Sequence, residues 1–218
     1  VSAISVTEIS SINGTSTVTD AAQADLVTGN NGDIVFTATA GTITLNDGDS
    51  DNTVITANGS GTITITANGS GSASINAAIT STSGNITINA NDDVIFSATG
   101  DVTNASGGNI SITADANSDS NGLGGALTMN DGTLINAGEG TITLEADESI
   151  TLGGLLTTSS SATAVTLTST SGGIVDGGGG DLVDVVAASG RLVIDAATGI
   201  GTGGALETTV ASVDLNNS

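Results

Sequence analysis

Residues 61–67 read GTITITA, and this heptapeptide decides the fold because its side chains alternate between polar and apolar with a period of two. Ile63 and Ile65 face one side of an extended chain while the threonines face the other, which is the pattern of a half-buried β-strand. The phrase recurs as GDIVFTA (32–38), GTITLND (41–47), GNITINA (84–90), GNISITA (108–114), GTITLEA (140–146) and GRLVIDA (190–196), with AVTLTST (164–170) as a degenerate copy. We expect a corner before each strand, where glycine permits a positive φ.

The spacing of these copies predicts a β-solenoid. Most copies begin 20 to 32 residues after the one before, which is the length of one solenoid coil. No single coil could bury its apolar face alone, so neighbouring coils must stack. Dividing the 218 residues by about 22 gives about ten coils, which form one solenoid segment over residues 1–218. The alternative, a flat sandwich, would need hairpin turns every 8–12 residues and usually some core aromatics.

The composition excludes several classes of function. The chain has 23 acidic residues and one basic residue, Arg191, so its formal net charge is −22. It also lacks histidine, cysteine and proline. Binding to nucleic acid requires lysine and arginine to displace counterions from phosphates, and anionic membranes are disfavoured for the same reason. No apolar run is long enough to cross a bilayer, so we expect no membrane insertion. Cations are the natural partners of such a chain.

These phrases resemble the repeat regions of filamentous-haemagglutinin-like proteins, which are large secreted bacterial surface proteins. The segment GIGTGGALETTV at 199–210 looks like a phrase that recurs in giant repetitive exoproteins of this type. The resemblance covers most of residues 32–218. It implies a right-handed parallel β-helix on an exported, fibrous protein, and therefore an extracellular or cell-surface location.

Two acidic loops are candidate calcium sites. Asp47, Asp49 and Asp51 alternate in the sequence DGDSDN, as in the first half of a calcium-binding loop. The pattern then fails, because Asn52 and Asn58 stand where glycine and glutamate are required. A solvated turn is the alternative reading of this loop.

The second acidic loop, DANSDSNG at 115–122, offers Asp115, Asn117 and Asp119 as oxygen ligands. A third segment, DGGGGDLVD at 176–184, superficially resembles the calcium-binding nonapeptide of β-rolls. Its register is wrong, since Leu182 occupies the aspartate position, and we interpret it as a flexible corner.

The outward threonines form T-x-T units such as Thr62, Thr64 and Thr66, which look like those of ice-binding solenoids. Other coils replace some of these threonines with asparagine or serine, so the array is expected to be irregular. Threonine is also an ordinary outward residue of β-strands. Ice binding is therefore a less favoured alternative reading of these threonine rows.

Catalysis is poorly supported, and we expect the chain not to be an enzyme. General bases and nucleophiles such as histidine, cysteine and lysine are missing. Glu145, Asp147 and Glu148 are close enough in sequence to suggest paired carboxylates of a glycosidase. However, the only aromatic residues, Phe36 and Phe96, occupy inward positions and cannot form a sugar-binding platform.

We therefore expect a structural segment of an extracellular surface fibre, sheath or adhesin stalk, which needs no cofactor, although Ca²⁺ binding is one hypothesis. The alternating residues at 2–8 and 211–217 predict strands at both ends, with no capping segment. The expected partners are copies of the chain or adjacent repeats, stacked end to end into a rod. The alternative is an adhesive module that binds glycans or a host or neighbouring cell surface, and a polysaccharide-degrading enzyme is less favoured.

Overall fold

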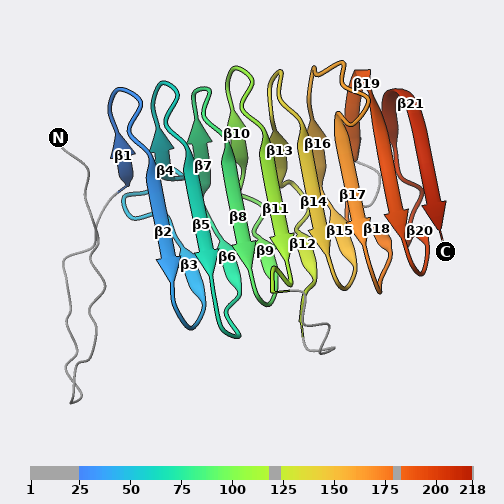
Figure 1. Cartoon of the computed structure of the whole chain (residues 1–218), viewed down its shortest axis with the longest axis horizontal. Helices are drawn as coiled ribbons and strands as arrows, with labels where there is room; N and C mark the ends of the chain where they lie inside the picture. The colour runs from blue at the N-terminus through green and yellow to red at the C-terminus, as the bar shows by residue number, and fades with distance from the viewer. Residues whose placement is uncertain (1–24, 118–123, 179–182, 218) are drawn as a thin grey trace.

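A computed structural model describes residues 25–117, 124–178 and 183–217. These residues form a parallel β-helix in which the chain winds through three faces and each strand pairs with its counterpart one coil further on (Figure 1). The described pairings are all parallel, which excludes the sandwich and confirms the solenoid. Within the described residues there is no helix, and so none that could span a bilayer.

The face that we call the broad face carries six strands of five residues each. They are β2 (Ile34–Ala38), β5 (Ile63–Ala67), β8 (Ile86–Ala90), β11 (Ile110–Ala114), β14 (Ile142–Ala146) and β17 (Val165–Ser169). Six of the repeated sequence phrases, together with the degenerate copy, lie on this face. GTITLND at 41–47 does not, because it forms a strand of the third face.

The rear face consists of β1 (Leu26–Thr28), β4 (Thr53–Ala57), β7 (Ala78–Ser81), β10 (Val102–Asn104), β13 (Leu134–Asn136) and β16 (Gly154–Leu156). The third face consists of β3 (Ile43–Leu45), β6 (Ala73–Ile75), β9 (Val94–Phe96), β12 (Leu127–Met129), β15 (Ile150–Leu152), β18 (Ile174–Asp176) and β20 (Ile200–Thr202). β19 (Val185–Ala196) and β21 (Thr208–Asn217) each pass from the rear face to the broad face. Rear and broad faces therefore join into one fourteen-stranded sheet, and the third face is a separate seven-stranded sheet.

The described residues contain seven complete coils and an eighth that β21 begins. Equivalent residues of successive broad-face strands are 29, 23, 24, 32, 23, 27 and 21 positions apart. Most coils are thus longer than the 22 residues assumed from the sequence, because the loops at the corners vary in length. The described coils number fewer than the ten expected for residues 1–218 both for this reason and because residues 1–24 lie outside the described part of the chain.

The core consists of inward columns in which like residues stack on one another. One column of the broad face runs Ile34, Ile63, Ile86, Ile110, Ile142, Val165, Leu192. Ile63, Ile86 and Ile142 have no exposed surface at all. Complete burial of such a side chain stabilises the fold by about 1.5–3 kcal/mol, so the column repeats that contribution coil after coil.

Glycines at the start of the broad-face strands also form a column, for a reason that differs from the expected one. The column consists of Gly32, Gly61, Gly84, Gly108 and Gly140, and none of these five glycines has a positive φ. Instead, a Cβ atom on Gly84 would run into the carbonyl of Gly61, and a Cβ on Gly140 would run into that of Gly108. From Gly61 onward, glycine is needed because the backbones of successive coils approach too closely for any side chain.

Buried polar side chains tie neighbouring coils together at the same corner. The hydroxyl of Ser81 donates to the carbonyl of Gly61 at 3.2 Å, and the amide of Asn104 donates to that of Gly84 at 2.6 Å. In a later coil, Thr157 donates to Gly140 at 2.5 Å. Each bond satisfies a carbonyl of the glycine column in the preceding coil, as a buried polar group requires.

The C-terminal strand has the sequence pattern of the core without its burial. Val213 and Leu215 of β21 pair with Leu192 and Ile194 of β19, yet 47% and 57% of their surfaces are exposed. Among the described strands β21 pairs with β19 alone, so its other edge is open. The strand expected at 211–217 is thus confirmed, whereas residues 2–8 lie outside the described part of the chain.

Candidate functional site

The loop between β3 and β4 contains Asp47, and its carboxylate organises the loop itself. One carboxylate oxygen accepts hydrogen bonds from the backbone N–H groups of Asp49 and Ser50, at 3.0 and 2.7 Å. The other oxygen accepts the N–H of Asn52 at 2.9 Å, and these bonds hold the pKa of Asp47 below its ordinary value. Asp47 is therefore engaged by the turn and does not converge with Asp49 and Asp51.

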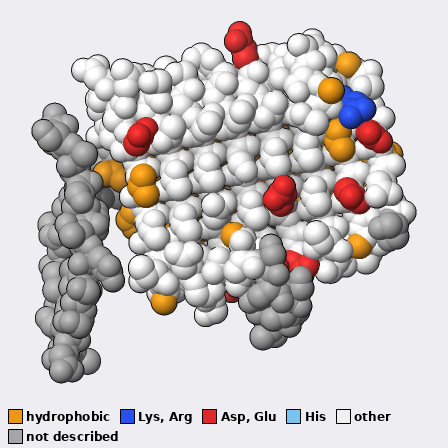
Figure 2. All heavy atoms as spheres, in the orientation of Figure 1, with side chains coloured by type: hydrophobic (Ala, Val, Ile, Leu, Met, Phe, Trp, Pro, Cys, Tyr) orange, Lys and Arg blue, Asp and Glu red, His pale blue; other side chains and the backbone are white. Residues whose placement is uncertain are grey.

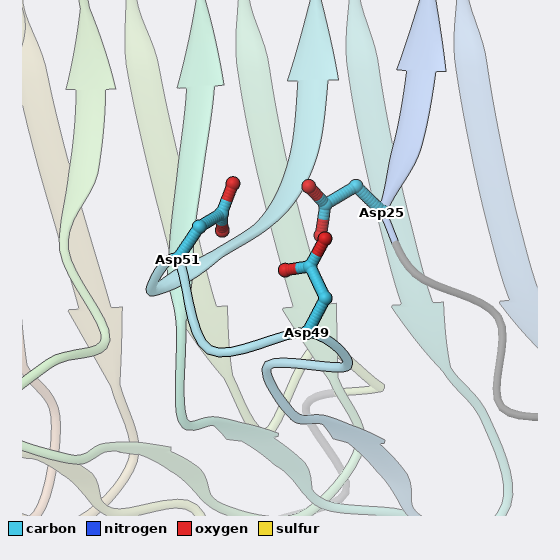
Figure 3. Close-up of side chains that lie close together, drawn as sticks. All are labelled: Asp25, Asp49 and Asp51. Carbon is cyan, nitrogen blue, oxygen red and sulfur yellow. The ribbon is translucent and has the colours of Figure 1, made fainter.

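Those two residues instead lie near Asp25, which precedes β1 in the coil below. The carboxylate oxygens of Asp25, Asp49 and Asp51 lie within 4.8 Å of one another (Figure 3). Burial, followed by the charges of Asp51 and Asp49, raises the pKa of Asp25, and its Oδ1 atom is buried without a hydrogen-bond partner among the described residues. Asp51 also accepts the backbone N–H of Thr53 at 2.7 Å. Calcium binding at this loop stays a prediction, with Asp25 as an additional ligand and Asp47 in a structural role.

The second predicted acidic site is only partly described. Asp115 and Asn117 lie just after β11, and Asp119 falls outside the described residues. Asp115 contributes to a shallow groove of about 350 Å³, which Glu145, Asp147 and Thr170 also line. The Oδ1 atom of Asp147 accepts the hydroxyls of Thr170 and Ser171 at 2.6 and 2.8 Å, which hold its pKa below the ordinary value.

A third carboxylate cluster was not foreseen from the sequence. The carboxylate oxygens of Asp176, Asp184 and Glu207 lie within 4.8 Å of one another, although the residues belong to different coils. Asp184 is only 2% exposed, and its Oδ2 atom accepts the backbone N–H of Glu207 at 2.8 Å. Burial, together with the nearby charges of Asp176 and Glu207, raises the pKa of Asp184 to about 6. Asp176 and Asp184 are the first and last residues of the DGGGGDLVD segment, whereas no local spacing signals Glu207, which the stacking of coils brings to them.

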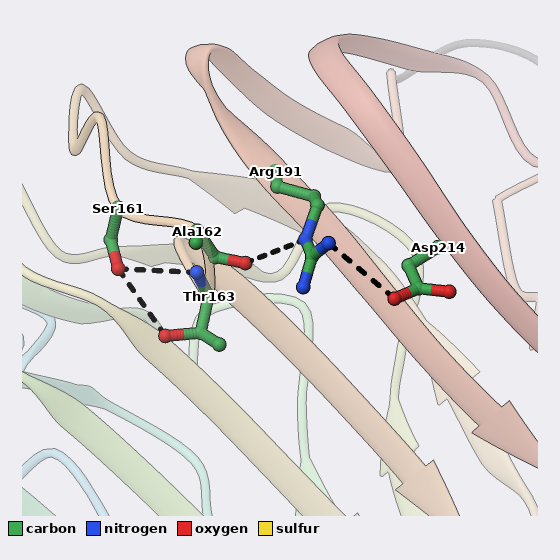
Figure 4. Close-up of polar contacts among 5 residues, drawn as sticks. All are labelled: Ser161, Ala162, Thr163, Arg191 and Asp214. Carbon is green, nitrogen blue, oxygen red and sulfur yellow. Dashed lines mark hydrogen bonds and ion pairs between the residues drawn. The ribbon is translucent and has the colours of Figure 1, made fainter.

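The single arginine is used in contacts between coils. Its Nε atom donates to the carbonyl of Ala162 at 2.8 Å, and its guanidinium lies 3.5 Å from the carboxylate of Asp214 on β21 (Figure 4). Both side chains of this ion pair are well exposed, so the pair contributes little stability. Arg191 thus contacts the loop before β17 on one side of β19 and β21 on the other.

The outward side chains of the broad face form regular columns, and Figure 2 shows this face as largely free of charge. The strand register aligns Thr64, Thr87, Ser111, Thr143 and Thr166 in one column, and Thr66, Asn89, Thr113, Glu145 and Thr168 in the next. We call these ten residues the threonine lattice. The array is irregular in its side chains, as expected, since Ser111, Asn89 and Glu145 replace threonines, but its register is continuous over these five strands.

The open C-terminal end carries an apolar groove of about 280 Å³. Its walls come from β19, β20 and β21 and from the segment before β21, and they include Ile194, Leu206, Val213 and Leu215. In the middle of the stack the corresponding inward positions are filled by the next coil. The groove is therefore the exposed cross-section of the solenoid core.

Comparison with known proteins gives no relative: no family model, no curated protein and no solved structure matches this chain. The resemblance to filamentous-haemagglutinin-like repeats therefore stays a prediction. Any function has to be argued from the geometry above.

Proposed function

We propose that this chain is a structural segment of an extracellular surface fibre, sheath or adhesin stalk, in which coils stack end to end into a rod. The observation that carries the proposal is the open edge of β21. Val213 and Leu215 continue the core columns of β19 but are about half exposed, and an apolar groove lies beside them. Among the described strands this edge of β21 has no partner, and unpaired edges recruit other strands.

The repeated design of the stack also supports this function. The interfaces between coils reuse the same apolar columns, so a further coil finds a matching apolar surface. A contact of this type joins unlike ends of two molecules, so it does not close and propagates a filament. The additional coil belongs either to the same polypeptide or to another copy, and both cases give a rod.

Catalysis has less support than a structural role. Asp147 is held by two hydroxyls, and Asp47 by three backbone N–H groups, so neither carboxylate is poised for proton transfer. Phe96 is completely buried and Phe36 packs partly against the core, which leaves no aromatic platform for sugars among the described residues. These features also weigh against the adhesive, glycan-binding alternative.

Sedimentation velocity of the 218-residue chain over a range of concentrations tests the proposal. We expect mass to grow with concentration, and electron micrographs of the large species to show thin rods of uniform width. Leu215→Asp places a charge in the stacking surface and should abolish the growth. Ser212→Asp adds the same charge on the outward side of β21 and should preserve it. A chain that stays monomeric at every concentration, or two variants that behave alike, would contradict end-to-end stacking.

A further inference from the structure

We propose that the threonine lattice on the broad face is a surface that binds ice. This inference goes beyond the proposed structural role, since it concerns the side of the rod and not its ends. The occupant is a crystalline, uncharged layer of water molecules, and the argument rests on spacing, rigidity, hydrogen-bonding capacity and charge.

The lattice has two regular repeats. Neighbouring strands in a sheet lie about 4.8 Å apart, which sets the repeat along each column. The two columns are separated by two residues along the strand, or about 6.6 Å at 3.3 Å per residue. Both distances are of the size of the repeats between water molecules on the faces of hexagonal ice. A sheet that keeps its register over five strands, from β5 to β17, presents them in two dimensions.

The side chains of the lattice are stiff. Threonine is branched at Cβ and has few accessible χ1 rotamers, so its hydroxyl and methyl groups hold fixed positions. Thr64, Thr87 and Thr143 are half-buried, since each stands beside a like neighbour from the next coil. A stiff array loses little conformational entropy when it orders a layer of water.

The hydroxyl groups of the lattice are available to solvent. None of the threonine or serine hydroxyls in the lattice is hydrogen-bonded to another described residue. Threonines at the corners behave differently: Thr99 donates to the carbonyl of Asn76 at 2.9 Å, and Thr133 donates to that of Ser97 at 2.9 Å. The fold thus uses corner hydroxyls for its own stability and leaves the lattice hydroxyls to bind water.

Charge distinguishes the lattice from the rest of the molecule. The chain carries a formal net charge of −22, yet Glu145 is the only charged residue among the ten lattice positions (Figure 2). Most of the other carboxylates described above lie at corners, as Asp47, Asp147 and Asp184 do. A patch with a single charge suits a neutral lattice of water, whereas strongly hydrated charges would disrupt one, and the lattice therefore ends before Asp195 of β19 and Asp214 of β21, which continue its two columns.

The other two faces lack a comparable surface. Their strands before β19 are mostly three residues long and present a single outward column, as Thr56, Thr80 and Thr103 do on the rear face. A flat polysaccharide crystal is a less suitable occupant of the broad face, because the described residues provide no exposed aromatic ring for its sugars to stack on.

Thermal hysteresis and inhibition of ice recrystallisation by the 218-residue chain test the proposal. We expect both activities in the unchanged chain. Thr87→Tyr, at the centre of the lattice, should lose most of the hysteresis, whereas Thr80→Tyr on the rear face should retain it. Circular dichroism and the melting temperature of each variant verify that the fold is intact.

A second pair of variants tests the proposal in the opposite direction. Glu145→Thr completes the lattice and should increase the hysteresis, whereas Glu139→Thr removes the same charge from an exposed turn and should not. An unchanged chain without either activity would overturn the proposal. So would equal effects of Thr87→Tyr and Thr80→Tyr, or binding to insoluble cellulose or chitin without any effect on ice.

Discussion

Strands β8 and β21 occupy the same columns of the solenoid but differ in their surroundings. Ile86 and Ile88 of β8 are completely buried between the coils on either side. Val213 and Leu215 continue these columns in β21, yet about half of each side chain is exposed. The alternating pattern therefore determines only which way a side chain points, and burial depends on whether a further coil covers it.

Truncation of a core side chain in each strand should give the largest contrast. Ile88→Ala leaves a cavity between two fixed coils, and we expect a loss of about 2–5 kcal/mol in the free energy of unfolding. Leu215→Ala removes a half-exposed side chain and should cost less than about 1 kcal/mol. Chemical denaturation of the monomeric chain measures both, and similar losses would mean that β21 is as well packed as the middle of the stack.

A methyl group added to a glycine should distinguish the interior from the edge in a second way. In Gly84→Ala the new Cβ meets the backbone of Gly61, so we expect a destabilisation of about 1–3 kcal/mol. Gly29, between β1 and β2, has open space around its Cα, and Gly29→Ala should change stability by about 0.5 kcal/mol or less. Equal melting temperatures of the two variants would show that the glycine column is not a close contact.

Two asparagines offer a smaller contrast between interior and edge. Asn104 donates to the carbonyl of Gly84 and accepts the N–H groups of Gly107 and Gly108, at 3.0 and 2.9 Å. Asn104→Ala leaves these buried groups unpaired, at a cost of about 2 kcal/mol. Asn216→Ala in β21 breaks one exposed bond to Asp195 and should be nearly neutral. If the urea midpoints of the two variants fell equally, the buried hydrogen bonds of Asn104 would not explain the stability of the interior.

The pH dependence of stability near β21 should be the smallest of these effects. The pKa of Asp184 is about 6 in the folded chain, above its ordinary value of 3.8, so the folded state binds the proton more tightly. The resulting stabilisation is complete below about pH 3.8 and disappears as the pH rises through 6. One pKa unit corresponds to about 1.4 kcal/mol, and solvent screening reduces the effect of such a shift.

Asp184→Asn should therefore stabilise the chain by about 1 kcal/mol at pH 7.5 and have no such effect near pH 4. Asp131→Asn removes an equal charge from an exposed turn and controls for the general relief of repulsion. Melting curves at the two pH values measure the difference. A gain at pH 7.5 no larger than that of Asp131→Asn would disprove the burial argument.

The sequence predicts the three-dimensional repeat better than it predicts the sites. Alternation in phrases such as GTITITA and GNITINA correctly identifies strands, inward residues and parallel stacking, because each coil repeats the same local physics. The role of Gly84 was misjudged, since a close approach between coils cannot be recognised in one strand. The length of a coil was underestimated because corner loops of different length separate the strands.

The carboxylate clusters show why the remaining features were out of reach. Asp25 meets Asp49 and Asp51 from another coil, and Asp184 meets Glu207 in the same way. Whether carboxylates from different coils lie close together depends on the lengths of the intervening loops, which the local sequence pattern does not determine. Asp47 depends on its loop in another way: its spacing suggests a metal ligand, and in the structure its carboxylate accepts three backbone N–H groups of its own turn.

Hydrogen exchange of the 218-residue chain, followed strand by strand as the protein concentration rises, tests the central claim most directly. In dilute solution we expect amides of β8 and β11 to be strongly protected and those of β21 to exchange quickly, because one edge of β21 is open. At high concentration β21 should become protected, as a further coil from another molecule covers it, while β8 and β11 stay unchanged. Protection of β21 equal to that of β11 in dilute solution, or exchange of β21 that is independent of concentration, would contradict the account.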